Sequence, residues 1–191
     1  MSLEAYNPLD IVNLGKSLTD AFLARPLQAL PTADFQGSGL YGLYYLPTAD
    51  AHKFYKREAG GDVPIYIGKA MTKGSKNSLF KRLNEHRKSI QAANTSLKAE
   101  DFQCRILLVD DVWVPLGEQL LINKFKPLWN KKIRGFGNKT LGGERLTQKP
   151  SNWDLLHPGR QRTTNTKNEA ALIELEEKLQ KHLDSFVNDV D

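Results

Sequence analysis

Three short apolar runs, each bounded by turn-forming residues, divide the middle of the chain. Residues 39–46 (GLYGLYYL) and 63–68 (VPIYIG) are rich in Tyr, Ile and Leu, and residues 102–109 (FQCRILLV) form a third run that Asp110 and Asp111 close. Runs of this length between Gly, Pro and Asp are typical of β-strands. We therefore predict a small sheet whose first two strands are neighbours and present tyrosines to a shared site.

Apolar residues at helical spacing surround these runs. A first helix is predicted to start at Asn7 and Pro8, and an amphipathic C-terminal helix covers residues 166–191. Two more helices, over residues 78–92 and from Pro115 onward, lie on either side of the third apolar run. This order indicates an α+β domain in which helices flank the sheet.

Polar side chains interrupt the apolar faces of the two middle helices. In the helix over residues 78–92, His86 lies on the leucine stripe and Arg82 lies one turn earlier at its edge. In the next helix, Glu118 shares a face with apolar residues. A carboxylate in that position is costly unless a cation, a metal or a hydrogen-bond donor compensates it. Glu118 is therefore either a metal ligand or an ion-pair partner of Arg82.

Composition limits the classes of protein to consider. A chain of 191 residues with 40% hydrophobic content fits a single soluble domain over residues 1–191. Its one cysteine, Cys104, excludes an internal disulfide and a multi-cysteine zinc site. The sequence shows no apolar run long enough to span a bilayer and no signal peptide, so we expect a cytoplasmic protein.

The net charge of +5 is concentrated in the middle of the chain. Residues 39–165 hold 22 basic and 11 acidic side chains, whereas both flanking segments are acidic. Such a surplus is typical of proteins that bind a phosphate backbone, although a merely solvated basic surface is the alternative. We expect residues 47–62, which are too polar for the core, and the glycine-rich loops of residues 131–165 to contact nucleic acid.

The order of these residues resembles the GIY-YIG nuclease superfamily. Residues 39–41 (GLY) stand for the first half of its signature, with Leu in place of Ile, and residues 66–68 (YIG) match the second half. Arg82, Glu118 and Asn130 follow in the order of the family's arginine, metal-binding glutamate and asparagine. Five matching positions are far more specific than either triplet alone.

The resemblance covers residues 38–132 as the catalytic core. It implies an α+β fold, an α/β sandwich with a small, central, mainly antiparallel three-stranded sheet flanked by helices. Residues 131–165 would then add basic DNA-contacting loops, and residues 166–191 would add the amphipathic C-terminal helix.

Within the superfamily, the chain looks most like the type II restriction endonucleases. The shared features are His86 one turn after Arg82, the PLWN segment that ends at Asn130, and the glycine-rich tail. This resemblance implies a bacterial homodimer that cuts double-stranded DNA at a GC-rich palindrome of the CCGCGG type, beside a companion DNA methyltransferase. A repair or homing nuclease of the same superfamily, and a DNA-binding module without catalysis, are the alternatives.

The resemblance also implies catalytic roles. Glu118 would hold one Mg²⁺ ion, for which Mn²⁺ could substitute, and Arg82 would donate to the scissile phosphate. Tyr41 would act on the attacking water, with His86 accepting its proton, because a free tyrosine has a pKa of about 10. Tyr66 would support the water and the phosphate.

The remaining candidates would hold the DNA in place. Asn130 would position the phosphate or Arg82, and Lys69 would contact a phosphate. The candidates for contacts to guanine or phosphate in the basic loops are Arg134, Asn138, Arg145, Gln148 and Arg160.

The first signature triplet is duplicated, which leaves the choice of tyrosine open. Tyr41 and Tyr44 end two tandem triplets, and strand alternation puts them on opposite faces of the sheet. We favour Tyr41, because it leaves Leu43 in the family's following apolar position and lets Tyr45 share its face.

Overall fold

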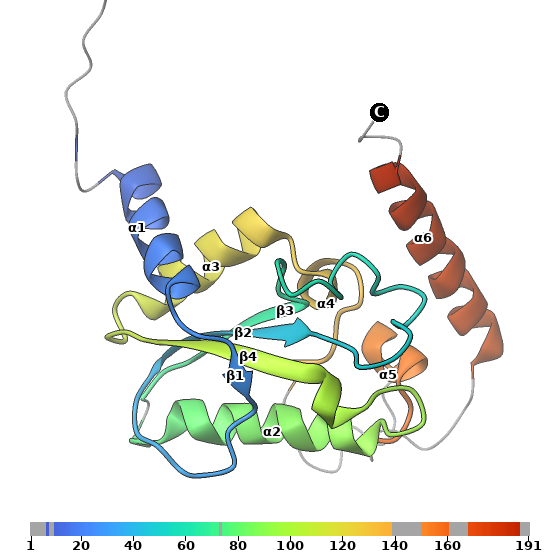
Figure 1. The fold of residues 1–191 in the computed structure, drawn as a ribbon, viewed down its shortest axis with the longest axis horizontal. Coiled ribbons are helices and arrows are strands. Elements are labelled where there is room, and N and C mark those ends of the chain that lie inside the picture. The colour runs from blue at the N-terminus through green and yellow to red at the C-terminus, as the bar shows by residue number, and fades with distance from the viewer. Residues whose placement is uncertain (1–6, 8–9, 73, 139–149, 161–167, 188–191) are drawn as a thin grey trace, which may run out of the picture.

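A four-stranded antiparallel sheet forms the centre of the fold, in a computed structural model that describes residues 7, 10–72, 74–138, 150–160 and 168–187 (Figure 1). The strand order is β1-β4-β2-β3. The strands are β1 (Gln28–Ala29), β2 (Gly39–Tyr45), β3 (Tyr66–Ala70) and β4 (Phe102–Leu108). The first signature triplet therefore lies on a central strand and the second on an edge strand.

Helices cover both faces of this sheet (Figure 1). Helix α2 (Ser78–Ala92) lies along one face, whereas α1 (Ile11–Leu23) and α3 (Val114–Phe125) lie along the other. The other helical segments are a 3-10 turn (Ala99–Asp101), α4 (Leu128–Lys131), α5 (Asn152–Leu156) and α6 (Glu169–Val187). This layered arrangement confirms the predicted α+β class.

Strand β2 divides the core into two clusters. All seven of its residues are buried, and alternate side chains point to opposite faces. Tyr41 and Leu43 pack in the larger cluster with α2, whereas Leu40 and Tyr44 pack in the smaller cluster with α1 and α3. Burial on both faces explains why this strand reads as a continuous apolar run.

The expected three-stranded sheet is corrected to four strands. The additional strand β1 has two residues, which pair with Cys104 and Gln103 of β4, and so short a segment carries no periodic pattern. Strand β3 begins at Tyr66, later than predicted, because Pro64 has no N–H to donate to the ladder. The third apolar run is confirmed as a strand over Phe102–Leu108.

The helices that flank the predicted site are confirmed, but the first helix starts later than expected. The side chain of Asp10 accepts a hydrogen bond from the Val12 amide at 2.9 Å, so Asp10 caps α1 and the helix begins at Ile11. The prediction of a start at Asn7 and Pro8 was therefore wrong.

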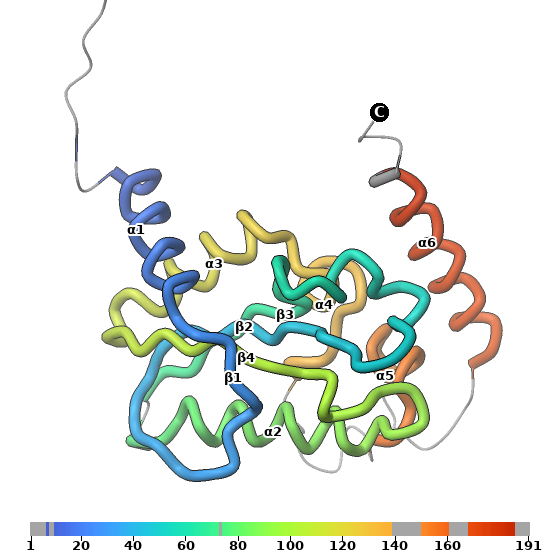
Figure 2. The backbone as a smooth tube through the Cα atoms, in the orientation of Figure 1, coloured from blue at the N-terminus to red at the C-terminus, as the bar shows by residue number. Residues whose placement is uncertain are grey.

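Residues 47–62 contribute to the core, contrary to our expectation. Phe54 and Tyr55 are buried in the larger cluster, and the segment folds back over the end of the sheet toward α6 (Figure 2). Lys53 forms an ion pair with Glu176 of α6 at 2.9 Å. The segment is polar on average, so its composition did not indicate that these two aromatic side chains are buried and anchor it.

The C-terminal helix packs against the protein's own core. Leu175 and Leu179 of α6 are buried in the larger cluster, and the side chain of Asn168 accepts a hydrogen bond from the Ala171 amide at 3.0 Å. None of the helices in the described part of the chain has the length and apolar character needed to cross a membrane.

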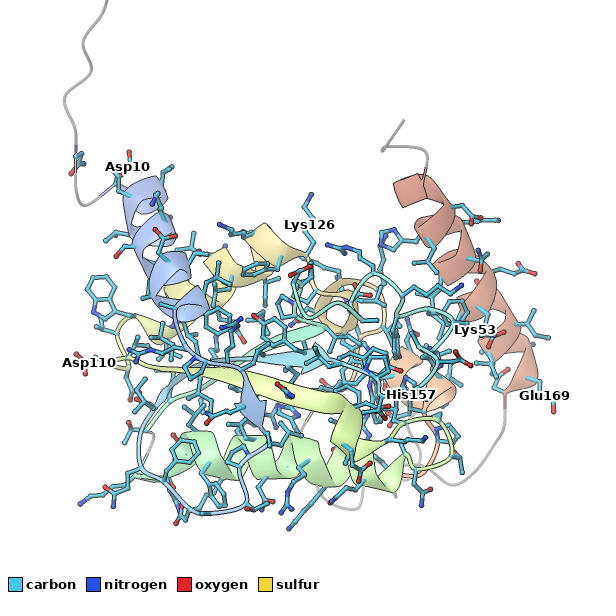
Figure 3. All side chains as sticks on the ribbon, in the orientation of Figure 1. Asp10, Lys53, Asp110, Lys126, His157 and Glu169 are labelled. Atoms are coloured by element: carbon cyan, nitrogen blue, oxygen red, sulfur yellow. The ribbon has the colours of Figure 1, made fainter. Side chains whose placement is uncertain are left out.

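A buried histidine ties the elements near α5 together. His157 is fully buried in the densely packed region beside α5 (Figure 3), and its two ring nitrogens contact the Tyr55 hydroxyl and, at 2.8 Å, the Ser96 hydroxyl. Burial, with smaller contributions from His52 and Arg160, lowers the pKa of His157 from 6.5 to about 3.

This histidine should make the protein sensitive to acid. Below its ordinary pKa of 6.5 the unfolded chain binds a proton that the folded chain binds only near pH 3, so stability falls as the pH drops through this window. We expect the free energy of unfolding, measured with urea, to fall by about 2 kcal/mol between about pH 7.5 and about pH 5. His157→Gln, which cannot be protonated, should lose most of this difference; an equal pH dependence in the variant would contradict the assignment.

Candidate active site

One pocket of about 540 Å³ collects most of the predicted catalytic residues. It opens beside β3, and β2, β3, α2 and α3 all contribute side chains to it. The predicted residues that line it are Tyr41, Tyr66, Lys69, Arg82 and Glu118. Residues that lie far apart in the sequence therefore meet at one place, as the signature predicts.

A hydrogen bond of 2.6 Å joins the Tyr41 hydroxyl to Nε2 of His86. Tyr41 lines the pocket, whereas the imidazole lies behind it and is buried. The Tyr66 ring contacts the His86 ring edge to face, with their centroids 5.3 Å apart. The histidine thus reaches the pocket through the hydroxyl of Tyr41.

The glycine of the second triplet makes room for the two tyrosines. Tyr41 and Gly68 are register partners on β2 and β3. A Cβ atom at Gly68 would lie 2.3 Å from the Tyr41 hydroxyl oxygen and 2.8 Å from the Tyr66 ring. The two phenol rings converge over this position, so only a residue without a side chain fits there.

Burial keeps both tyrosines neutral. It raises the pKa of Tyr41 well above 10, as does the neighbouring Tyr66, while the charge of Arg82 acts in the opposite direction. Burial likewise raises the pKa of Tyr66, again opposed by Arg82. Tyr41 can therefore give up its proton near neutral pH only to an adjacent acceptor, and Nε2 of His86 occupies that place.

Arg82 forms the wall of the pocket on the α2 side. One guanidinium nitrogen contacts Glu85 at 2.7 Å, and another donates to the carbonyl oxygen of Gly137. Its side chain is only 15% exposed, so most of its hydrogen-bonding capacity is directed into the protein and the pocket. A guanidinium held in this way suits a phosphate, which it can bind with two parallel hydrogen bonds.

Glu118 lines the same pocket from α3. A Cβ at Gly117 would lie 2.4 Å from the Leu40 side chain, so this glycine lets α3 approach β2 closely. The Glu118 carboxylate then reaches the pocket, where it forms an ion pair with Lys69 of β3 at 2.8 Å. Its partner is thus Lys69, and the alternative pairing with Arg82 is corrected.

The donor set at this position limits the metal that it could hold. Among the described residues, no three His, Cys, Asp or Glu side chains are close enough to hold a metal ion together. Glu118 offers one partly exposed carboxylate. Mg²⁺ is commonly held by one or two carboxylates, with water and substrate phosphates completing its coordination. The described residues of this site fit a metal held in this way.

Asn130 has a different place from the one expected. Its side chain accepts a hydrogen bond from the Ile67 amide at 2.8 Å and donates to the Ile67 carbonyl at 2.9 Å. These two bonds hold β3 from its edge. The amide does not line the pocket but holds the strand that carries Tyr66 and Gly68, so its contact with the phosphate or with Arg82 stays a prediction.

Besides Arg160, the structure describes three of the predicted DNA-contacting residues. Lys69 lines the pocket, and Arg134 and Asn138 are exposed on the segment beside it. Arg145 and Gln148 lie outside the described residues.

The prediction for Arg160 is corrected, because its side chain is only 4% exposed. It forms an ion pair with Asp154 at 2.6 Å and donates to the carbonyl oxygens of Gly135 and Phe136. This arginine is therefore used inside the protein.

Sequence reasoning missed Phe136 as part of this site. Its ring stacks on His86, with centroids 4.5 Å apart and an interplanar angle of 18°. Phe136 stands between Gly135 and Gly137, in the glycine-rich segment that the sequence predicts to contact DNA. An aromatic residue between two glycines was the available signal, because the glycines let the backbone turn closely around a buried ring.

Comparison with known proteins agrees with this geometry. Residues 33–185 match the family model described as the Eco29kI GIY-YIG domain, whereas a search of curated proteins gave no match. The match covers most of the chain and extends past the predicted core to include Phe136 and Arg160. The fold, the paired tyrosines and this match together place the chain in the GIY-YIG restriction endonuclease family that Eco29kI represents.

Proposed function

We propose that the protein is a type II restriction endonuclease that hydrolyses phosphodiester bonds of double-stranded DNA at a GC-rich palindrome and depends on Mg²⁺. The observation that carries the proposal is the arrangement of the pocket. The hydrogen-bonded Tyr41 and His86 pair, the Arg82 guanidinium and the Glu118 carboxylate all converge on it.

Each side chain has a separate task in this reaction. Arg82 exchanges its contact with Glu85 for the scissile phosphate and neutralises charge on the non-bridging oxygens. Tyr41 takes a proton from the attacking water while His86 accepts the proton of the Tyr41 hydroxyl, so the buried phenol never carries a full charge. Tyr66 lies beside Tyr41 and orients the same water.

Glu118 is the residue that would hold the metal ion in this proposal. Mg²⁺, or Mn²⁺ in its place, supplies positive charge to the leaving 3′-oxygen when it is bound. Lys69, which neutralises Glu118 in the absence of DNA, turns to a phosphate oxygen of the substrate.

Recognition of a palindrome requires two-fold symmetry, so the active form in this proposal is a homodimer. Arg134 and Asn138 are exposed beside the pocket and are the described candidates for contacts to DNA. A companion methyltransferase in the bacterial cytoplasm would protect the same site in the host genome.

Digestion of plasmid DNA tests this proposal. We expect purified protein with Mg²⁺ to give discrete, reproducible fragments, EDTA to abolish them and excess Mg²⁺ to restore them. Sequencing the fragment ends then gives the recognition site. A smear would indicate a less specific nuclease of the repair or homing type, and intact DNA with retained binding would favour a DNA-binding module without catalysis.

A further inference from the structure

Two arginines bind three consecutive carbonyl groups of the turn at residues 135–137. Arg160 donates to the Gly135 and Phe136 carbonyl oxygens at 3.2 and 2.9 Å. Arg82 donates to the carbonyl oxygen of Gly137. The turn is therefore held between a pocket residue and a residue that lies behind the pocket.

Arg160 is itself fixed on several sides. Its Nε donates to Asp154 at 2.7 Å, and its guanidinium lies 4.1 Å above the Trp153 ring. Asp154 also accepts a hydrogen bond from the Ser151 hydroxyl at 2.6 Å. A buried guanidinium with this many partners has little rotational freedom, so it can fix the carbonyls that it binds.

The turn places Phe136 flat against His86. The two rings are nearly parallel, and Phe136 also contacts Tyr66 edge to face with centroids 5.1 Å apart. Trp129 and Trp153 pack behind Phe136, with ring centroids 4.5 and 5.2 Å away. The Phe136 ring cannot move without displacing this cluster, so it restricts rotation of the imidazole plane.

We propose that Phe136 and Arg160 are positioning residues for the cleavage reaction. Arg160 fixes the turn, Phe136 fixes the His86 ring with Nε2 toward the Tyr41 hydroxyl, and the Gly137 carbonyl fixes Arg82. The inference rests on the proposed roles of His86 and Arg82. Catalytic geometry in this protein therefore depends on residues C-terminal to the core that carries the signature.

A double-mutant cycle separates positioning from general stability. We expect Phe136→Leu to lower the single-turnover cleavage rate about 10- to 100-fold, because small displacements of a catalytic group have effects of this size. In a His86→Ala background the same change should have little further effect, because the group that Phe136 positions is already absent. Equal losses in both backgrounds would overturn the proposal.

Phe54→Leu is the matched control. Phe54 is buried in the same core cluster, but its ring contact is with His52 and not with the rings that pack around Phe136. The substitution removes a similar ring from the core, so the folded fraction of this variant should cleave at the wild-type rate. A second variant, Arg160→Lys, replaces the guanidinium that binds the turn. Its control is Arg105→Lys, because Arg105 also donates to backbone carbonyls, those of Leu23 and Arg25.

Nitrogen NMR of labelled histidines gives a readout that needs no cleavage. We expect the His86 signal, assigned by its loss in His86→Ala, to show one tautomer in the wild type and a mixture in Phe136→Leu and Arg160→Lys. An unchanged His86 signal in both variants would overturn the positioning role. If the wild-type protein does not cleave DNA, the proposed function fails, and this measurement still decides whether the two residues position the ring.

Discussion

Glu118→Gln should abolish DNA cleavage while leaving DNA binding intact. The amide keeps the shape of the carboxylate but removes the charge that pairs with Lys69 and that would hold the metal ion in the proposed reaction. Loss of transition-state charge stabilisation of this kind costs about 10²- to 10³-fold or more in rate. Single-turnover cleavage with Mg²⁺ and a gel-shift assay with Ca²⁺ on the same DNA measure the two properties separately.

Glu174→Gln is the control for this experiment. Glu174 lies on α6, 66% exposed, and also forms an ion pair with a lysine, Lys178, at 2.5 Å. Its substitution should change neither cleavage nor binding. Near-wild-type cleavage by Glu118→Gln would show that Glu118 serves only as an ion-pair partner of Lys69. Loss of DNA binding together with cleavage would indicate that Glu118 has a structural role.

Tyr41→Phe should slow cleavage by about 10²- to 10⁴-fold, the range typical of a lost general acid or base. The phenylalanine ring retains the packing in the larger cluster but removes the hydroxyl that connects the pocket to His86. The rate is best measured under single-turnover conditions, with thermal unfolding of each variant checked in parallel.

The chain provides its own control three residues further on. Tyr44→Phe removes a hydroxyl from the same strand, but on the face that packs with α1 and α3 and away from the pocket. We expect this variant to cleave at the wild-type rate. If Tyr44→Phe loses activity and Tyr41→Phe retains it, the assignment of the two triplets is reversed.

Strand alternation predicted from the sequence that Tyr41 and Tyr44 lie on opposite faces of the sheet, and the family resemblance favoured Tyr41. The period of two fixes Tyr41, Leu43 and Tyr45 on one face, and the structure shows them in one cluster. Helical periodicity in the same way placed Arg82 and His86 on the inner side of α2. Predictions that depend on the period of a single element were thus correct.

Predictions that depend on contacts between distant segments were less successful. Arg160 was expected to contact DNA and Asn130 to position the phosphate or Arg82, yet both bind backbone groups of other segments. Local composition shows that a side chain is polar but not which carbonyl or amide the fold brings to it. The same reason hid the burial of Phe54 and Tyr55 in an apparently polar loop.

The ion pairs at the rim of the pocket have a consequence for ligand discrimination. Lys69 and Arg82 are each neutralised by a carboxylate, Glu118 and Glu85. A free nucleotide or inorganic phosphate gains little by entering, because it must first displace these partners. A DNA duplex gains additional binding free energy from contacts outside the pocket, and this free energy can offset the cost of displacing the two carboxylates. The abundant small phosphates of a cell should therefore be poor inhibitors of this enzyme.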